Sequence, residues 1–463
     1  MESKASESER QVDYDELRSV VGPTGLVTDP ELMTGQVRDW TGRWVGSTPA
    51  VVYPRSTAEV VAVVEWCRRN HVALVPQGGN TGMVGGGVPL GGELLVNLGR
   101  MTAVDVDAQA GHLVAEAGAT LHAVQEAAHS AGWHYAVDLG ARDSATIGGT
   151  IATNAGGLQV LRYGDTRHQL LGVEAVSGTG AVVGDLRGLL KDNTGYHIPS
   201  LLAGSEGTLA VITRACLRLH APASQAVVAL IGFDAEAEAI AAVPDIRRHV
   251  ADLRALELFL ADGLALVCEQ LGLPSPLDRS WAAYLLLEAA GAEGVTERLA
   301  HDLAQLHVAT DAVAVGEDPA QRARLWRYRE AHTEAISMVG IPHKLDVTLP
   351  HVEMAGFITD LRHAVAGHTP GARTWIFGHA ADGNLHVNVT GVDPADEELD
   401  GLVLELVAER GGSISAEHGI GRAKAAHLHL NRTEAELTLA RRLKDAFDPD
   451  GILNPGVLFP HGL

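Results

Sequence analysis

Short apolar runs alternate with glycine, proline and asparagine between residues 48 and 223. Apolar, β-branched runs bounded in this way are typical of strands. One helix is expected over Ser56–Asn70, because Ser56 or Thr57 can cap it and valines recur along one side. The expected strands are Ala50–Val52, Ala73–Pro76, Leu94–Asn97, Val173–Val176 and Ala210–Thr213.

Strands and helices alternate regularly in the next region, residues 224–430. This order predicts a separate α+β domain in which helices cover an antiparallel sheet. Expected strands are Val227–Ile231, Ala255–Leu260, Trp281–Leu287, Ala312–Val315, His343–Leu349, Trp375–Gly378 and Leu385–Val389, and expected helices include Asp234–Val250, Val295–Leu306 and Pro319–Ser337.

The two ends of the chain complete this α+β organisation. Residues 431–463 predict a charged helix followed by turns, and a tail this short is expected to pack back on the first domain. Residues 1–47 predict only a helical lead-in near Val12–Val21. The expected divisions are therefore residues 1–47, 48–223, 224–430 and 431–463.

Composition narrows the class of protein. The 463 residues are 46% hydrophobic, enough for two or three folded domains, and the formal charge of −23 makes nucleic acid a poor partner. The three cysteines form no CxxC pair, which excludes a cysteine-based cluster. The polar first ten residues are no secretory signal and no apolar run could span a membrane, so we expect a cytoplasmic protein.

Glycine is concentrated in three loops that could hold a phosphorylated ligand. Six of the ten residues from Gly78 to Gly87 are glycine, and their backbone N–H groups could form an anion-binding nest. The loop fits neither a Walker A motif nor GxGxxG. Taken alone, a flexible surface loop is an equal alternative, but the small-residue segments Gly148–Gly157 and Gly204–Thr208 favour a ligand.

Histidine and carboxylate side chains in the second domain suggest a metal site. Asp382-Gly383 is a hairpin turn signal, so His379 and His386 should lie on adjoining strands, with Asn388 on the same face as His386. An ordinary polar sheet face is the alternative for the two histidines alone. Glu417 and His418 could complete the site if the chain turns there, and the alternative is a surface Glu-His pair at the end of a strand. His427 and His429 are expected on a solvated helix.

Three further polar residues could bind a carboxylate. Arg329 and Thr333 are four residues apart on the expected helix Pro319–Ser337, and Lys344 follows in the next strand. For Arg329 alone, a surface salt bridge with Glu330 or Glu334 is the more favoured interpretation.

Several motifs in order resemble the vanillyl-alcohol-oxidase/PCMH-type flavoproteins: PQGGNTGMVGGGVP, IGGTIATNAGG, RYGDTRHQLLGVEAV, DNTGYHIPSLLAGSEGTLAVIT and the closing NPG. The resemblance implies an FAD-binding domain of two subdomains. It also implies FAD contacts from Pro76, Gly78, Gly79, Asn80, Thr81, Gly82, Ser144, Gly148, Gly149, Asn154, Glu206, Gly207, Ile212 and Asn454. Because the glycine loop carries Asn80 and no nearby cysteine, FAD is expected to be non-covalent.

The second domain resembles the D-2-hydroxyacid dehydrogenase branch, most closely the D-2-hydroxyglutarate dehydrogenases, through RExxT, KLDVTLP, GHxxDGNLHVNV and EHGIG. This implies that a divalent metal, with zinc expected, is ligated by His379, His386 and Glu417. It also implies that His418 is the base and binds substrate with Arg329, Thr333, Lys344 and Asn388.

The implied reaction is oxidation of a D-2-hydroxyacid by hydride transfer to FAD, with a metal to acidify the hydroxyl and His418 to take its proton. The Arg-Thr-Lys set favours a dicarboxylate, D-2-hydroxyglutarate. The alternatives are D-lactate or glycolate and, from another class, a non-catalytic flavin-binding subunit. Electrons would leave through a separate protein, a quinone or oxygen, and the chain could form a homodimer.

Overall fold

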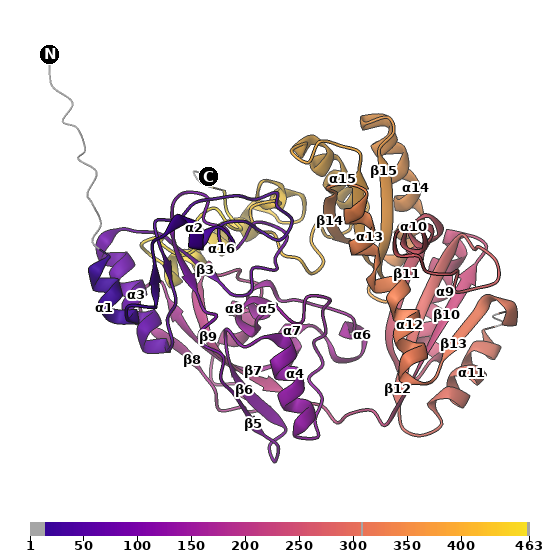
Figure 1. Ribbon diagram of the computed structural model, residues 1–463, viewed down its shortest axis with the longest axis horizontal. Helices are drawn as coiled ribbons and strands as arrows, with labels where there is room; N and C mark the ends of the chain where they lie inside the picture. Colours follow the sequence, from indigo (N-terminus) through magenta and orange to yellow (C-terminus); the bar gives the residue numbers. More distant parts are fainter. Residues whose placement is uncertain (1–13, 307–308, 461–463) are drawn as a thin grey trace.

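The computed structural model describes residues 14–306 and 309–460, and its elements form two lobes (Figure 1). The first lobe holds two small sheets and the C-terminal segment, and the second holds one large sheet. Within the described residues, no helix is long and apolar enough to cross a membrane. Helix α1 covers Asp15–Val21, and the earlier part of the helix expected near Val12–Val21 lies outside the described residues.

The first sheet of the first lobe has four strands in the order β1 (Leu26–Val27), β2 (Val51–Val52), β4 (Leu94–Asn97) and β3 (Leu74–Gln77). Strands β2, β4 and β3 are parallel, so their connections must cross over, and such a crossover is usually helical. Helix α3 (Thr57–Asn70) is that crossover, and the Ser56 hydroxyl accepts a hydrogen bond from Glu59 N at 3.2 Å. The sequence therefore predicted both the helix and its cap.

The second sheet is antiparallel, in the order β5 (Val104–Asp107), β6 (His112–Glu116), β9 (Ala210–Arg218), β7 (Leu170–Ser177) and β8 (Val182–Asp185). It shares one hydrophobic core with the first sheet. The helices of this lobe are α2 (Pro30–Met33), α4 (Leu121–Ser130), α5 (Ile147–Thr153), α6 (Val160–Tyr163), α7 (Thr166–Gln169) and α8 (Ile198–Leu202).

The second lobe is built on a seven-stranded antiparallel sheet. In spatial order its strands are β13 (Val313–Gly316), β10 (Gln225–Phe233), β12 (Ala283–Gly291), β11 (Leu253–Leu260), β15 (Arg373–His379), β16 (Asn384–Thr390) and β14 (His343–Thr348). Its strands are apolar on both faces: Val227 and Val228 belong to different hydrophobic clusters, as the two-residue period of a strand requires.

Helices cover both faces of this sheet. One cluster contains residues of α9 (Glu236–His249), α11 (Val295–Gln305), α14 (His351–His368) and α15 (Glu397–Glu409). The other contains residues of α10 (Ala261–Leu271), α12 (Pro319–Glu330) and α13 (His332–Met338). The single helix expected over Pro319–Ser337 was therefore wrong in one respect, because the chain ends one helix before Ala331 and starts another after it.

The C-terminal segment returns to the first lobe. Helix α16 (Glu434–Phe447) begins with a capping box between Thr433 and Glu436, and the chain after it pairs with β3 through Leu453 and Leu74. Two short 3₁₀ helices complete the elements: η1 (Thr310–Ala312) lies between α11 and β13, and η2 (Ala425–Leu430) lies between α15 and α16. His427 and His429 stand on η2.

Candidate functional site

A cavity of about 910 Å³ lies where the two lobes meet, and its size is at the upper end of the range for ligand pockets. The glycine-rich loop after β3, the start of α5 and the loop before β9 line it from the first lobe. Strands β14, β15 and β16, helices α12 and α13 and the Glu417–His418 turn line it from the second. A ligand inside it would touch both domains.

Two glycines of the glycine-rich loop are required because the Ser144–Thr146 segment approaches them closely. A Cβ atom on Gly79 would stand 1.8 Å from the Ser144 carbonyl oxygen, and one on Gly78 would stand 2.0 Å from the Thr146 hydroxyl. Gly82 has open space where its Cβ would be. The Thr146 hydroxyl is buried and finds no hydrogen-bond partner among the described residues, although it lines the cavity. A flat, polar cofactor would fit this wall and satisfy that hydroxyl.

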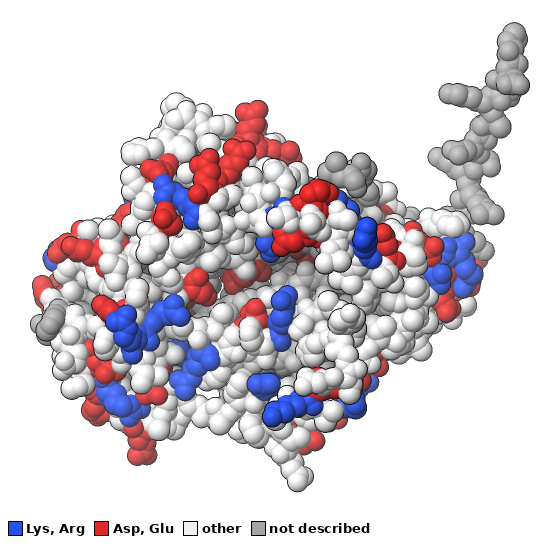
Figure 2. Space-filling view, turned by 180° about the vertical axis from the view of Figure 1, so that it is seen from behind, with Lys and Arg blue, Asp and Glu red and all other residues white. Residues whose placement is uncertain are grey.

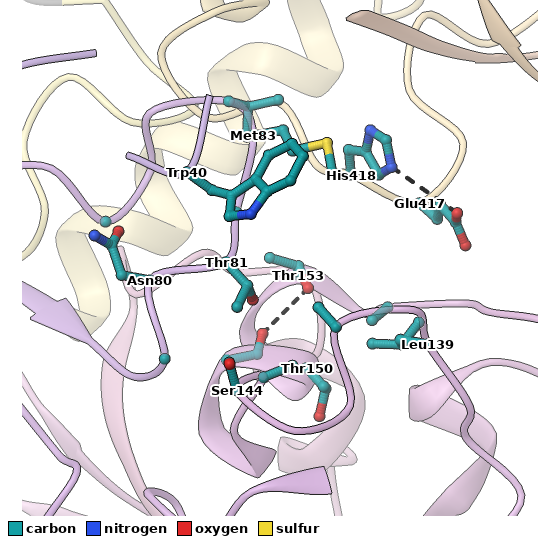
Figure 3. Close-up of a pocket in the computed structure, with 18 of the residues that line it drawn as sticks. Trp40, Asn80, Thr81, Met83, Leu139, Ser144, Thr150, Thr153, Glu417 and His418 are labelled. Carbon is teal, nitrogen blue, oxygen red and sulfur yellow. Dashed lines mark hydrogen bonds and ion pairs between the residues drawn. The ribbon is translucent and has the colours of Figure 1, made fainter. Parts of the chain in front are cut away.

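Most of the residues that the resemblance assigned to FAD line this cavity: Pro76, Gly78, Gly79, Asn80, Thr81, Gly82, Ser144, Gly148, Gly149, Glu206, Gly207 and Ile212. Figure 3 shows Thr81, Ser144, Thr150 and Thr153 grouped on one side of it. Asn154 and Asn454 are not among its lining residues.

Asn154 and Asn454 instead hold loops in place. The Asn154 amide nitrogen donates to Asp165 Oδ2 at 2.8 Å, and its oxygen accepts from Arg167 N at 2.9 Å. The Asn454 amide nitrogen donates to the carbonyl oxygens of Gly86 at 2.9 Å and Glu206 at 2.7 Å. The C-terminal segment therefore fixes both the glycine-rich loop and the loop before β9.

Glu206 also has a structural role that the resemblance did not suggest. Its two carboxylate oxygens accept hydrogen bonds from Ile420 N at 2.8 Å and Gly421 N at 2.7 Å, which belong to the second lobe. Burial raises the pKa of Glu206 to about 7, against the lowering effect of these two N–H groups. Glu206 therefore joins the lobes beside the His418 turn.

His379, His386 and Glu417 converge on the second-lobe side of the cavity. Glu417 Oε1 lies 3.5 Å from His379 Nε2 and 3.7 Å from His386 Nε2. The predicted hairpin brings the histidines together, with their ring centroids 5.2 Å apart. Two imidazole nitrogens and one carboxylate oxygen are a donor set suited to a divalent metal.

Two buried carboxylates orient the histidines, and sequence reasoning missed both. His379 Nδ1 lies 2.7 Å from Glu257 Oε1, and His386 Nδ1 lies 3.3 Å from Asp346 Oδ1. Each carboxylate can accept the Nδ1 proton, which leaves Nε2 to face Glu417. The signal was a lone acidic residue inside an apolar strand, as in Leu256–Leu260 and Leu345–Val347.

Asp346 also lies within 4.8 Å of His386, Glu417 and His418, which together form a second conceivable ligand group. However, its carboxylate is already occupied. Asp346 Oδ1 accepts from the Asn384 amide at 2.7 Å, and Oδ2 accepts from Glu417 N at 2.7 Å and His418 N at 2.9 Å. We therefore assign Asp346 to holding the Glu417–His418 turn rather than to ligation.

His418 stands next to this group and faces the cavity (Figure 3). Its ring stacks on that of His386, with centroids 5.6 Å apart, and its Nε2 lies 3.9 Å from Glu417 Oε1. The predicted turn after it is present, because Gly419 and Gly421 both have positive φ. Glu417 and His418 can therefore serve the same site although they are adjacent in sequence.

The four residues expected to bind substrate, Arg329, Thr333, Lys344 and Asn388, line the same cavity. Arg329 is only 6% exposed and its Nε donates to Glu257 Oε2 at 2.7 Å, so the surface salt bridge with Glu330 or Glu334 was the wrong interpretation. Lys344 stands opposite Asn388 in the β14–β16 register. Burial lowers the pKa of Lys344 to about 8, and no carboxylate of the described chain pairs with it.

Comparisons with known proteins agree with this geometry. A family model described as "FAD linked oxidases, C-terminal domain" matches residues 222–458, and one described as "FAD binding domain" matches residues 48–184. The chain is 34% identical to the mitochondrial D-2-hydroxyglutarate dehydrogenase of Arabidopsis thaliana, covering 97% of this chain and 82% of that one. It is 38% identical to the Bos taurus protein of the same name, with coverages of 95% and 82%.

Two further similarities extend the comparison. A putative mitochondrial D-lactate dehydrogenase of Schizosaccharomyces pombe is 33% identical, with 98% of this chain and 90% of that one covered. The crystal structure of p-cresol methylhydroxylase superposes with a TM-score of 0.73 at 14% identity, covering 96% of both chains. That likeness concerns the fold alone, and it confirms the expected PCMH-type architecture.

Proposed function

The chain belongs to the FAD-linked oxidase family and is an FAD-dependent oxidoreductase, and from this we propose that it oxidises D-2-hydroxyglutarate to 2-oxoglutarate. One observation carries the proposal. A single cavity holds the glycine-lined wall that suits FAD, the convergent nitrogen and oxygen atoms of His379, His386 and Glu417, and the unpaired cation Lys344. A 2-hydroxyacid with a second carboxylate matches these groups.

We propose that His379, His386 and Glu417 hold a divalent ion, with zinc the expected metal. Nε2 of each histidine and Oε1 of Glu417 are the ligand atoms, because Glu257 and Asp346 accept from the other imidazole nitrogens. A metal bound there supplies Lewis-acid chemistry that favours loss of the substrate's hydroxyl proton. The ionised form of Glu417 suits ligation: burial alone would raise its pKa, but His379 and His386 lower it.

His418 is proposed as the general base. Its Nε2 would take the proton of the substrate's hydroxyl group, while the hydrogen on the carbon that bears this hydroxyl leaves as hydride. FAD supplies the hydride acceptor when bound. Imidazole is suited to this role because it exchanges protons near neutral pH.

Arg329, Thr333, Lys344 and Asn388 are proposed to bind the substrate's carboxylates. The Arg329 Nε–H donates a hydrogen bond to Glu257. None of the described residues accepts a hydrogen bond from the terminal amino groups of Arg329. Lys344 and Asn388 present an ammonium and an amide from neighbouring strands. A charge-assisted hydrogen bond from a half-buried ammonium favours an anionic group.

FAD is proposed to bind non-covalently, because the glycine-rich loop has Asn80 and no cysteine is among the lining residues of the cavity. The electron acceptor would be a separate protein or a quinone. The cytoplasmic location and a homodimer stay predictions.

A second candidate function is oxidation of D-lactate or glycolate. The similarity to a putative D-lactate dehydrogenase favours it, and the metal and base groups would serve it equally. The half-buried Lys344, which pairs with no described carboxylate, argues against it, because a monocarboxylate leaves that ammonium without an anionic partner. A non-catalytic flavin-binding subunit is the remote alternative, and the convergence of His379, His386 and Glu417 argues against it.

The experiment is anaerobic mixing of metal-replete holoenzyme with D-2-hydroxyglutarate while the visible flavin absorbance is followed. Rapid bleaching with the D enantiomer and none with the L enantiomer is expected. Bleaching with D-lactate or glycolate but not with D-2-hydroxyglutarate would replace the proposed substrate. An oxidised flavin that none of these acids reduces would reject the function.

A further inference from the structure

A small hairpin in the lead-in segment forms part of the cavity wall. Residues 37–46 pair through an Arg38–Val45 bridge, and Gly46 N donates to the Val37 carbonyl oxygen at 2.8 Å. The buried Asp39 closes the hairpin, since its Oδ1 accepts from Trp44 N at 3.1 Å. At the tip, Trp40 lines the cavity, although this segment carries no recognised motif.

The hairpin is fixed from both lobes. On the first-lobe side, the Asn80 amide nitrogen donates to the Arg38 carbonyl oxygen at 2.7 Å. On the second-lobe side, Arg43 forms an ion pair of 2.7 Å with Asp400 on α15, and Asp400 Oδ1 is also 2.8 Å from His343 Nδ1. His343 directly precedes Lys344 on β14, so the hairpin is anchored beside that lysine.

Trp40, at the tip of the hairpin, contacts Lys344. The Lys344 ammonium lies 4.6 Å from the centroid of the indole ring, within the range of a cation–π interaction. No described carboxylate pairs with this ammonium, so the ring is its principal electrostatic partner. Trp40 is itself 53% exposed, and Figure 3 shows its ring on the same side of the cavity as Met83 and His418.

We propose that Trp40 is a specificity-determining positioning residue, which holds the Lys344 ammonium where it meets the second carboxylate of a dicarboxylic substrate. This inference rests on the proposed function for the identity of the substrate. A lysine has a long, flexible side chain, and fixing it before the substrate arrives reduces the ordering cost of binding. Trp40 would therefore favour dicarboxylates over monocarboxylates without taking part in proton or hydride transfer.

The test compares Trp40→Leu with the wild type on two ligand pairs. The first pair is D-2-hydroxyglutarate and D-lactate, compared by kcat/KM. The second is 2-oxoglutarate and pyruvate, compared by dissociation constants from the perturbation of the flavin spectrum. We expect Trp40→Leu to lower the dicarboxylate preference about 3- to 30-fold, chiefly through KM, with kcat nearly unchanged.

Two further variants separate positioning from a general effect on folding. Trp40→Phe keeps an aromatic face and should restore most of the preference. In a Lys344→Met background, Trp40→Leu should change the preference no further, because the interaction has already been removed. Trp133→Leu is the matched control, since Trp133 lies outside the lining of the cavity and bonds to the Ala108 carbonyl oxygen.

Equal loss for both members of a pair, or the same loss in the Lys344→Met background, would overturn the inference. Equal dissociation constants for 2-oxoglutarate and pyruvate in the wild type would also overturn it. The binding measurement needs no turnover. If neither hydroxyacid reduces the flavin, the proposed function fails while the dissociation constants still decide the role of Trp40.

Discussion

Glu417 Oε2 accepts a hydrogen bond of 2.9 Å from the backbone N–H of Gly157. Glu417 is a proposed metal ligand of the second domain, whereas Gly157 belongs to the FAD-binding domain. One carboxylate oxygen is therefore held by the flavin domain while the other, Oε1, faces His379 and His386. The geometry of the proposed metal site thus depends on how the two domains are docked.

Gly156→Ala should disturb this link. A Cβ atom at Gly156 would lie 2.8 Å from Glu417 Oε2 and 3.2 Å from Val160 Cγ2, so the carboxylate must move. We expect bound metal and turnover to fall about 10-fold while flavin remains bound, which metal analysis and the flavin spectrum can measure. Gly367→Ala is the control, because its Cβ meets nothing within 4 Å. Wild-type metal content in Gly156→Ala would contradict the coupling.

Glu257→Gln should weaken metal binding, although Glu257 is not itself a proposed metal ligand. Glu257 accepts from both His379 Nδ1 and Arg329 Nε, and a glutamine has only one acceptor oxygen to replace two. Loss of such a partner typically costs about 10- to 100-fold in metal affinity or activity. Competition with a chelator measures the affinity.

The control for Glu257→Gln is Glu288→Gln. Glu288 is also a buried carboxylate, on the neighbouring strand β12, but it bonds to Trp326 Nε1 at 2.6 Å and does not line the cavity. Equal metal affinities in the two variants would mean that Glu257 does not orient His379.

The sequence predicted the part of the site that local pattern controls. Asp382-Gly383 forms the expected hairpin, and a tight turn fixes strand register, so His379 and His386 could be placed together from spacing alone. Gly419 and Gly421 similarly predicted the turn that aims Glu417 and His418 at one place.

Contacts between distant segments could not be predicted in this way. Glu257 lies 122 residues before His379, and neither the residues around Glu257 nor this spacing indicates that the two side chains are in contact. Trp40 contacts Lys344 because polar contacts with both domains hold the hairpin of residues 37–46 in place. The break at Ala331 is marked by no glycine or proline, and α12 and α13 pack in the same hydrophobic cluster on the sheet.

His418→Ala should slow flavin reduction without removing the flavin. Loss of a positioned general base typically lowers the rate by about 10²- to 10⁴-fold. Stopped-flow bleaching with D-2-hydroxyglutarate measures the rate constant, and metal content must be recorded because His418 Nε2 is 3.9 Å from Glu417 Oε1. His427→Ala on η2, outside the cavity lining, is the control. A wild-type rate in metal-replete His418→Ala would remove His418 from the mechanism.

Deprotonation of Lys344 should lower kcat/KM for the dicarboxylate substrate at alkaline pH. Burial lowers the pKa of Lys344 to about 8, so the free enzyme carries the ammonium below that pH and a neutral amine above it. A charge-assisted hydrogen bond is worth about 1.5–3 kcal/mol, so kcat/KM for D-2-hydroxyglutarate should fall about 10- to 100-fold above pH 8.

The pH profile of kcat/KM reports the free enzyme, which makes it the measurement for this lysine. In Lys344→Arg the decline should move to higher pH, because a guanidinium stays charged throughout the accessible range. D-lactate has no second carboxylate, so its profile should lack the decline in the wild type. An alkaline decline of equal size with D-lactate, or one that persists unchanged in Lys344→Arg, would assign the titration to another group and separate Lys344 from substrate recognition.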